Sequence, residues 1–524
     1  MVRVDCSRDL GRKGVNMAIS RTTFLPNLSF LTVLSLTAPS LSALGLAGCG
    51  DDTKTTAGVE TMTTGASVNV TITGNDTEPT TTVNPTTGLG KLDLPDDGET
   101  VDLGCNADGK CNLLDILFVI DNSGTMGEEQ KNLAANFPFL IDKIRNLKDK
   151  DMEPVNADVN IMVTTTDFGH PLCSPFERPD YDPAKGSPIN SACTDRLTRF
   201  TSLDNKVMVP EACTNGCNAT MPATPMDPFI NFNPDSSNVV GGDPAGDPAA
   251  QALSCIGPQG IDGCGMEAPL ETMLQALDPN KPWNMGSRPF LRKGAVLAIV
   301  ILTDEVECSV KDYKYFDPQL VNDPMYNQYW ENDPMTQAKN EPTSAVCFNA
   351  GVSCIDNNAD GIYESCMSED KGVLQPLTRY IGYLKNVLIE QQNKEVIMLG
   401  ILGVPKVTAH NPLPPYEPTD GGVFDLVYRT WNQSDILPND SSTPQKKEYE
   451  FGIGPGCTDP ATGQATPNTR VIDVCQALDT PDDPNTPNNE AKLRCCIESI
   501  CDDDFSDAIN CLAGILEQSL EAPG

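Results

Sequence analysis

The chain has 524 residues, of which 39% are hydrophobic, enough for one sizeable core with irregular segments attached to it. Acidic residues outnumber basic ones by 73 to 36, which gives a formal net charge of −37. Polyphosphate binding needs clustered lysine and arginine, so this balance argues against a nucleic-acid partner and favours cations as ligands.

The first 48 residues have the pattern of an export signal. Basic residues from Arg8 to Arg21 precede an apolar stretch at 30–46, which ends in Leu46-Ala47-Gly48-Cys49. This pattern resembles a bacterial lipoprotein signal peptide with its lipobox; an ordinary cleaved signal is the alternative. The resemblance implies that Cys49 is acylated and becomes the first mature residue. We therefore expect a lipid-anchored protein of the cell envelope, at the outer membrane or cell surface rather than at the inner membrane.

The next segment, 49–110, is rich in threonine, glycine and proline. Residues 51–90 alone hold 14 threonines and almost no large apolar side chains, so this segment cannot pack a core. We expect a flexible tether that holds the folded part away from the membrane surface. No later apolar run approaches the roughly 20 residues that a membrane-spanning helix needs, so lipid would be the only anchor.

Cysteine usage agrees with export. The chain has 20 cysteines; Cys6 lies in the signal and Cys49 is the expected lipid site, which leaves an even number. Outside the cytoplasm disulfides are the default interpretation, and a thiolate zinc site is the alternative. Sequence does not determine connectivity, but four pairs are close enough to brace loops. These pairs are Cys105/Cys111, Cys213/Cys217, Cys255/Cys264 and Cys354/Cys366.

The folded region is expected at 111–405, where strand and helix patterns alternate. Strands are predicted at 115–120, 159–165, 295–302 and 396–402, and helices at 128–148, 269–277 and 377–391. This alternation predicts an α/β fold with a doubly wound, mostly parallel sheet. Two stretches rich in Pro, Gly and Cys interrupt it at 168–265 and 309–372, and we expect them to be disulfide-braced insertions. Residues 406–524 are predicted to form a small, loop-rich, Cys-containing C-terminal appendage.

Polar side chains follow two of the predicted buried strands. Asp121-Asn122-Ser123-Gly124-Thr125 comes directly after the first strand, and Thr303-Asp304 ends the strand at 295–302. In an open α/β sheet ligands bind at the carboxyl ends of strands, so these two ends could face each other. Carboxylate and hydroxyl oxygens suit Mg²⁺, which can also leave a coordination position for a ligand from elsewhere. Thr164 to Asp167 follows another strand and could lie nearby, although strand hydroxyls more often lie on the strand surface.

Here the sequence resembles the von Willebrand factor A (vWA) family, over residues 113 to about 405. Asp121, Ser123 and Thr125 match its D-x-S-x-S metal motif, with Thr for the last Ser, and Thr303-Asp304 matches its later T-D element. The resemblance implies a doubly wound, Rossmann-like sheet and a metal ion-dependent adhesion site (MIDAS) for Mg²⁺, or for Mn²⁺ or Ca²⁺. It further implies that Ser123 and Thr125 contact the ion directly, whereas Asp121 and Asp304 often act through water.

The chain departs from the family pattern before Pro269-Leu270. The family's threonine is Ala268 here, and Glu267 precedes it. Either the site lacks one oxygen ligand and binds metal more weakly, or Glu267 replaces that ligand and alters the charge at the metal. A simpler alternative for the whole motif is a helix cap, because Asp and Ser are favoured at helix N-termini.

A second candidate site lies at 356–364. Asp356, Asn358 and Asp360 occupy the first, third and fifth positions of an EF-hand-like calcium loop, with Gly361 at the sixth and Glu364 beyond it. The twelfth position is Met367 where that loop needs Glu. Ca²⁺ binding at 356–364 and a disulfide-tied acidic turn are both open interpretations.

The function expected from these features is binding of a protein partner, through an acidic residue of that partner and a divalent ion, in adhesion or in scaffolding of an envelope complex. The alternative is a structural surface lipoprotein with a vestigial metal site. A secreted hydrolase is a further alternative, but G-x-S-x-G and H-E-x-x-H are both absent, and neither His170 nor His410 sits in a recognisable motif. We therefore do not expect an enzyme.

Overall fold

The computed structural model describes residues 112–520 except 177, 203–204, 439 and 482–490. These residues belong to one of the two units into which the chain divides, Asp96–Gly524. The predicted signal peptide, the predicted lipidation site Cys49 and the predicted tether at 49–110 lie outside the described residues.

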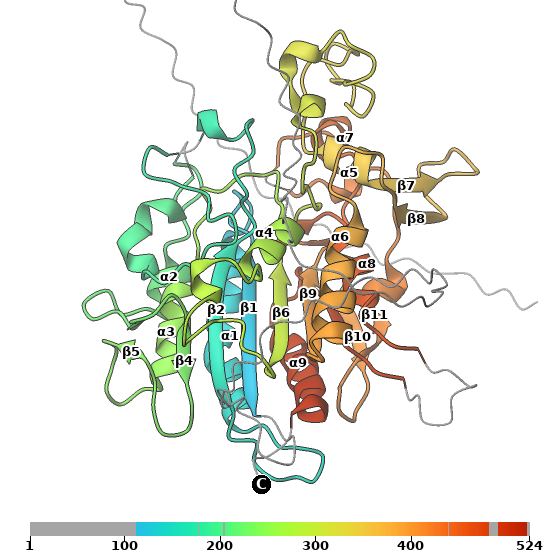
Figure 1. Ribbon diagram of the computed structural model, residues 1–524. Helices are drawn as coiled ribbons and strands as arrows, with labels where there is room; N and C mark the ends of the chain where they lie inside the picture. The colour runs from blue at the N-terminus through green and yellow to red at the C-terminus, as the bar shows by residue number, and fades with distance from the viewer. Residues whose placement is uncertain (1–111, 177, 203–204, 439, 482–490, 521–524) are drawn as a thin grey trace, which may run out of the picture. The chain divides into compact units, whose positions relative to one another are not determined.

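A six-stranded, mostly parallel sheet forms the centre of this unit, with strand order β14-β9-β6-β1-β2-β4 (Figure 1). Its strands are β1 (Leu113–Ile120), β2 (Asp158–Thr165), β4 (Ile230–Phe232), β6 (Val296–Leu302), β9 (Val396–Leu402) and β14 (Cys495–Ser499). All neighbours pair in parallel except β4, which pairs antiparallel with β2. The predicted α/β class with a mostly parallel sheet is confirmed.

Two hydrophobic cores form because successive side chains of a strand point to opposite faces of the sheet. On one face Ile116 and Phe118 pack with α1 (Gly127–Arg145), α3 (Pro248–Ile256) and α9 (Ser506–Ser519). On the other face Leu117 and Val119 pack with three helical segments. These are α4 (Pro269–Ala276), α6 (Leu377–Ile381) continued by the π-helix η6 (Gly382–Gln391), and α8 (Thr469–Gln476). A strand buried on both faces reads as a continuous apolar run, which is why β1, β2, β6 and β9 could be predicted.

The first insertion, 168–265, is more regular than expected. It holds η1 (Ser174–Phe176), η2 (Cys193–Phe200), α2 (Glu211–Thr214), β3 (Thr224–Pro225) and β5 (Val239–Val240). It also supplies the edge strand β4 and helix α3, whose residues belong to the first core. The insertion is therefore partly built into the main fold.

The second insertion follows β6 and has a small core of its own, which includes Phe316, Trp330 and Phe348. Its elements are η4 (Tyr313–Phe316), η5 (Pro318–Leu320), α5 (Ala345–Gly351) and the hairpin of β7 (Val352–Ile355) and β8 (Ser365–Ser368). The short η3 (Pro282–Asn284) lies between α4 and β6.

The expectation of a C-terminal appendage needs correction. Strand β14 pairs in parallel with β9, and α9 packs in the same core as α1, so residues 406–524 complete the main sheet and one of its layers. Around them lie β10 (Val407–His410), β11 (Pro418–Gly421), η7 (Gly422–Asp425), η8 (Gln433–Asp435), α7 (Pro444–Phe451), β12 (Cys457–Asp459) and β13 (Gly463–Ala465).

Eight disulfides include every cysteine of the described residues, so the structure favours disulfides over a thiolate zinc site. Among the predicted pairs, Cys354–Cys366 is confirmed and Cys105/Cys111 lies outside the described residues. The other two were wrong. Their cysteines form the longer-range bonds Cys193–Cys213, Cys217–Cys255 and Cys173–Cys264 instead.

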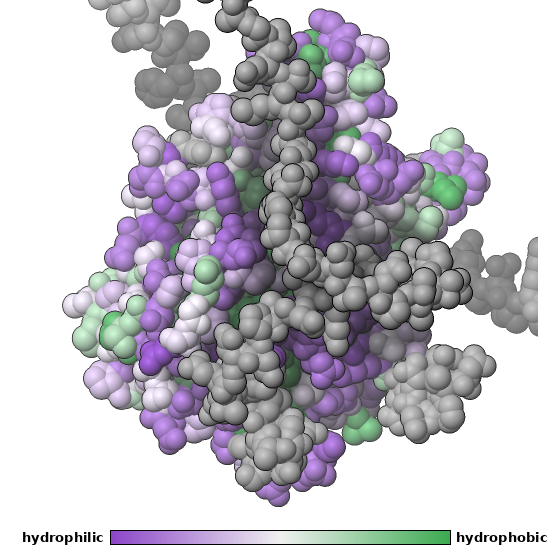
Figure 2. All heavy atoms as spheres, viewed as in Figure 1, coloured by the Kyte–Doolittle hydropathy of each residue, from purple (hydrophilic) through white to green (hydrophobic). Residues whose placement is uncertain are grey.

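The face of the molecule drawn in Figure 2 carries mainly hydrophilic residues outside the grey atoms, as expected for a chain with 73 acidic residues. Among the described residues, no helix combines the length and apolar character needed to cross a bilayer.

Candidate metal centre

The candidate site lies at the carboxyl ends of β1 and β6, which are neighbours in the middle of the sheet (Figure 1). From β1 the chain proceeds to β2 and β4 on one side, whereas β9 and β14 lie beyond β6 on the other. Such a reversal of strand order leaves a crevice outside the strand ends, where ligands bind in open α/β sheets. The backbone N–H of Asp121 donates to the Leu302 carbonyl at 2.9 Å, which ties the two strand ends together.

Asp121 is fully buried at the base of this crevice. One carboxylate oxygen, Oδ1, accepts the Ser123 N–H at 2.8 Å, and Oδ2 accepts the Thr303 hydroxyl at 2.5 Å. The carboxylate is thereby held in one orientation by groups from both strand ends. Helix α1 begins later, at Gly127, and its N-cap residue Met126 makes no side-chain cap. The motif is therefore not the helix cap that was the simpler alternative.

The two predicted motifs, 121–125 and Thr303-Asp304, also contact each other through Thr125 and Asp304. The Thr125 hydroxyl donates to Asp304 Oδ2 at 2.5 Å. The Ser123 hydroxyl and Asp304 Oδ1 are both buried and have no hydrogen-bond partner among the described residues. Gly124 and Thr125 are exposed, so the site is open on one side.

Glu267 joins the site from a third segment. The next residue, Ala268, donates its N–H to the Thr166 carbonyl at 3.0 Å, which places this segment beside the end of β2. The Glu267 side chain is fully buried, and neither of its carboxylate oxygens has a hydrogen-bond partner among the described residues. The Thr166 hydroxyl is also buried and without a partner. Ala268 itself supplies no side-chain oxygen where the family pattern has threonine.

The electrostatics of the site are those of crowded, buried carboxylates. Burial raises the pKa of Asp121 from 3.8 to about 6, against the hydrogen bonds from Thr303 and Ser123. Burial and then the charge of Asp121 raise the pKa of Asp304 to about 8. Burial, followed by the charges of Asp121 and Asp167, raises the pKa of Glu267 well above its usual value. Each shift shows that negative charge here lacks compensation.

A cation would supply that compensation. The ion pairs found among the described residues include none of Asp121, Glu267 and Asp304. Within the described ranges, no three His, Cys, Asp or Glu side chains come together as a metal-binding group. The oxygens that do converge are a mixed set of hydroxyls and carboxylates, which is the donor chemistry that Mg²⁺ accepts.

Three further residues of the site carried little or no sequence signal. Asp167 ends the Thr164 to Asp167 segment noted above, and its Oδ2 accepts both the Tyr181 hydroxyl at 2.6 Å and the Cys264 N–H at 3.2 Å. Tyr181, from the first insertion, in turn accepts the Asn122 amide at 2.8 Å. Glu129 on α1 is buried, and burial and the charge of Asp304 raise its pKa. In the sequence, an acidic residue at this place indicates only that the first turn of a helix favours negative charge, so Glu129 did not stand out as a site residue.

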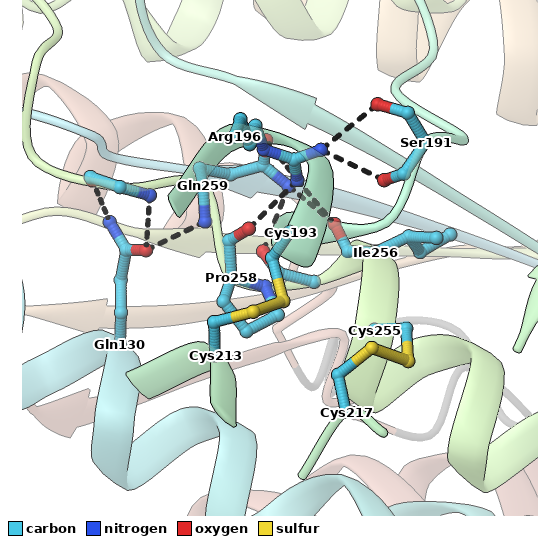
Figure 3. Close-up of a disulfide and its surroundings, with 12 residues drawn as sticks. Gln130, Ser191, Cys193, Arg196, Cys213, Cys217, Cys255, Ile256, Pro258 and Gln259 are labelled. Carbon is cyan, nitrogen blue, oxygen red and sulfur yellow. Dashed lines mark hydrogen bonds between the residues drawn. A yellow bond between two sulfur atoms is a disulfide. The ribbon is translucent and has the colours of Figure 1, made fainter. Parts of the chain in front are cut away.

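The first insertion also contacts the loop 121–125, here called the candidate metal loop, through a network of which Figure 3 shows Gln130, Gln259 and Arg196. Gln130 of α1 donates to the carbonyls of Asp121 at 2.8 Å and Gly260 at 2.7 Å, and its amide oxygen accepts the N–H groups of Gln259 and Gly260. Arg196 donates to the Pro258 carbonyl at 2.8 Å and to the Gln259 side chain at 3.3 Å. In Figure 3 this network lies beside two disulfides, Cys193–Cys213 and Cys217–Cys255. The insertion therefore positions the loop that carries Asp121.

A close backbone approach strengthens this contact. Gly263 donates its N–H to the Asn122 carbonyl at 2.7 Å, and a side chain at Gly263 would lie 2.5 Å from the Asn122 amide. Glycine is therefore the residue that lets the insertion come so near to the candidate metal loop.

The candidate calcium loop belongs to the β7–β8 hairpin. Asp356 accepts the N–H groups of Asn358 and Gly361, Asp360 accepts that of Ile362, and Glu364 accepts both the N–H of Asn357 and the side-chain amide of Asn358. The carboxylates thus serve the loop's own turns, and Cys354–Cys366 closes its base. Met367, at the twelfth position, is 64% exposed and brings no oxygen. These contacts are those of a disulfide-tied turn, and Ca²⁺ binding at 356–364 stays a prediction.

Neither histidine forms a hydrogen bond with Asp121, Asp304 or Glu267 among the described residues. His170 packs against the Phe316 ring at 4.7 Å, its Nδ1 accepts the Leu172 N–H, and burial lowers its pKa to about 4. His410 contacts Glu498 of β14 at 2.9 Å. Neither contact involves a serine hydroxyl of the kind that a hydrolase uses.

Comparisons with known proteins returned no assignment. No family model matches the chain, and no curated protein matches it.

Proposed function

We propose that this chain is an envelope-anchored lipoprotein whose vWA-like domain binds a protein partner through a divalent ion held at a MIDAS-like site. When the six strands of the sheet are numbered in chain order, their order across the sheet is 3-2-1-4-5-6, an order typical of doubly wound folds. Helices cover both faces of the sheet. The motifs that carry the family resemblance lie where such folds bind ligands.

The observation that carries the proposal is the group of buried oxygens without partners. Ser123 Oγ, Asp304 Oδ1 and both oxygens of Glu267 are buried and unsatisfied among the described residues. A buried polar atom without a partner costs about 1–3 kcal/mol and a charged one costs more, so each such atom in a native structure calls for an explanation, and a bound ion is one. A divalent ion satisfies oxygens of both kinds at once.

Ser123 and Thr125 would contact the ion, Asp304 and Glu267 would supply negative charge, and Thr303 would keep Asp121 oriented towards it. When bound, Mg²⁺ or another divalent ion would supply a coordination position for a carboxylate oxygen of the partner. A chain with net charge −37 otherwise repels an acidic group, so this contact requires a local positive charge. Adhesion or the scaffolding of an envelope complex are the functions that such a contact serves.

The test compares the wild-type full chain with Asp121→Ala. Mg²⁺ uptake measured by calorimetry should weaken at least about tenfold, because the carboxylate that faces both strand ends is lost. Capture of a partner from solubilised envelope should require Mg²⁺ in the wild type, fail with a chelator and fail with Asp121→Ala. Asp151→Ala is the matched control, since Asp151 is an exposed acid on the loop between α1 and β2. Equal capture in all conditions would leave a structural role with a vestigial site.

A further inference from the structure

A cavity of about 590 Å³ opens beside the candidate metal centre. Gly124 of the candidate metal loop and Glu305, the residue after Asp304, form the end nearest the centre. Side chains from the first insertion, from the residue that follows it and from α7 add apolar surface; they include Ile261, Met266 and Phe451. We call this space the Glu305 cavity.

Glu305 is the group of this cavity that lacks a partner. Its side chain is 9% exposed, and its carboxylate forms none of the hydrogen bonds or ion pairs found among the described residues. A side chain added at Gly265, another residue of the wall, would meet Glu305 Oε1 at 3.5 Å, so that oxygen borders the cavity.

The other acids of the wall are already paired. Asp262 forms an ion pair with Arg178, and Glu450 forms one with Lys446 at 3.3 Å. Lys447 also acts electrostatically on Glu305, but it forms its own ion pair with Asp440 at 2.9 Å, so Glu305 is the acid of the cavity wall without an ion pair among the described residues. A carboxylate that is nearly buried and unpaired calls for a cationic or donor group from outside the chain.

We infer that the Glu305 cavity takes a basic side chain, lysine or arginine, of the same partner segment whose carboxylate binds at the metal centre. This inference rests on the proposed function. The aliphatic stem of the basic residue packs along Ile261, Met266 and Phe451, and its charged end donates to the Glu305 carboxylate. The partner segment thus carries an acidic residue for the divalent ion and, a few residues away, a basic residue for the Glu305 carboxylate.

The test uses the full chain and two series of blocked glycine-rich hexapeptides. One series holds one Asp and one Lys separated by one to three residues; in the other, norleucine replaces Lys and keeps the apolar stem without the charge. In Mg²⁺ the wild type should bind the best Lys peptide about tenfold more tightly than its norleucine counterpart, the size of one charge-assisted hydrogen bond.

Glu305→Gln should reduce that ratio to near one, and Gly265→Leu, which places a side chain in the cavity, should do the same from another position. Glu153→Gln, an exposed acid at the opposite end of the sheet, should keep the ratio. The ratio is taken within each variant, so a change in Mg²⁺ affinity cancels.

The outcomes separate the two proposals. Mg²⁺-dependent binding without a preference for Lys, or a preference that survives both substitutions, overturns the inference and leaves the proposed function standing. A preference for Lys that is lost in Glu305→Gln but indifferent to chelator supports the cavity and contradicts the metal-dependent contact. Failure of every peptide to bind in Mg²⁺ overturns the inference, while Mg²⁺ uptake by calorimetry still tests the metal centre by itself.

Discussion

Asp121→Asn tests the electrostatic account of the site most directly. The amide has the shape of the carboxylate, so its oxygen can still accept the Ser123 N–H, and its nitrogen can donate to the Thr303 hydroxyl. The substitution removes a buried negative charge and keeps both contacts. We expect the free energy of unfolding to rise in the absence of metal.

The size of the effect follows from the pKa of Asp121, which burial raises from 3.8 to about 6. About two pKa units correspond to about 3 kcal/mol. A carboxyl with a raised folded pKa holds its proton more tightly in the native state. The wild type therefore loses more stability than Asp121→Asn as the pH rises from about 4 to about 6, while Asp304 and Glu267, whose pKa values are also raised, lower the stability of both proteins. The variant and the wild type should be equally stable below about pH 4 and differ by about 3 kcal/mol above pH 6.

Denaturant unfolding of the full chain with intact disulfides, followed by circular dichroism in EDTA at a series of pH values, measures this difference. Added Mg²⁺ at 100 times the wild-type dissociation constant should raise the stability of the wild type by about 2.7 kcal/mol, and that of a variant that binds tenfold more weakly by about 1.4 kcal/mol. The difference between the two proteins therefore becomes smaller in Mg²⁺.

Asp247→Asn is a control in which we expect the opposite change in the free energy of unfolding. Asp247 caps α3 by accepting the N–H groups of Ala249 and Ala250, and these contacts together with Arg145 lower its pKa against the effect of burial. Its stabilising effect is present above about pH 4 and is lost on acidification, so this variant should be less stable at neutral pH. If Asp121→Asn were also less stable than the wild type in EDTA at neutral pH, or if its effect did not change with pH, the account of uncompensated charge would be refuted.

Two further substitutions test residues around the ion. Glu267→Gln keeps the volume of the side chain and removes one charge, so Mg²⁺ affinity measured by calorimetry should fall about tenfold; an unchanged affinity would show that Glu267 does not replace the family's threonine as a ligand. Gln130→Leu removes the amide that links the Asp121 carbonyl to Gly260, and it should weaken Mg²⁺ binding several-fold while the liganding side chains stay intact. Wild-type affinity in Gln130→Leu would mean that the insertion does not position the loop.

The sequence predicted those parts of the fold whose residues carry a strong local pattern. Strands β6 and β9 are continuous apolar runs, β1 is one apart from Asp115, and β2 has an apolar centre at 161–163; their structural bounds lie within two residues of the predicted ones. Strand β14 escaped prediction because its sequence contains two cysteines and Glu498, whose burial depends on a contact with His410, 88 residues away. Strand β4 has three residues, too few for any period to show.

The same distinction holds for the candidate site. Asp121 and Asp304 follow buried strands directly, so a parallel sheet brings them together, and their contacts through Thr303 and Thr125 agree with that expectation. Tyr181 reaches Asp167 from a loop without periodicity, and no local pattern marks it. Long-range disulfides such as Cys173–Cys264 were missed for a related reason, since spacing along the chain says little about which thiols folding brings together.

The two insertions begin at the carboxyl ends of β2 and β6, the edge of the sheet where the candidate metal centre lies. Residues that the sheet supplies, Asp121 and Asp304, would hold the ion, while Ile261 of the first insertion and Met266, which follows it, would form the wall that faces a partner. Disulfides hold that wall in place without a large core of its own. On the proposed function, a change at Met266 can therefore alter which partner is accepted and leave the ion in place, whereas Ile261 also packs in the first core of the sheet. On the proposed function, affinity depends on the strand ends and selectivity depends on the insertions.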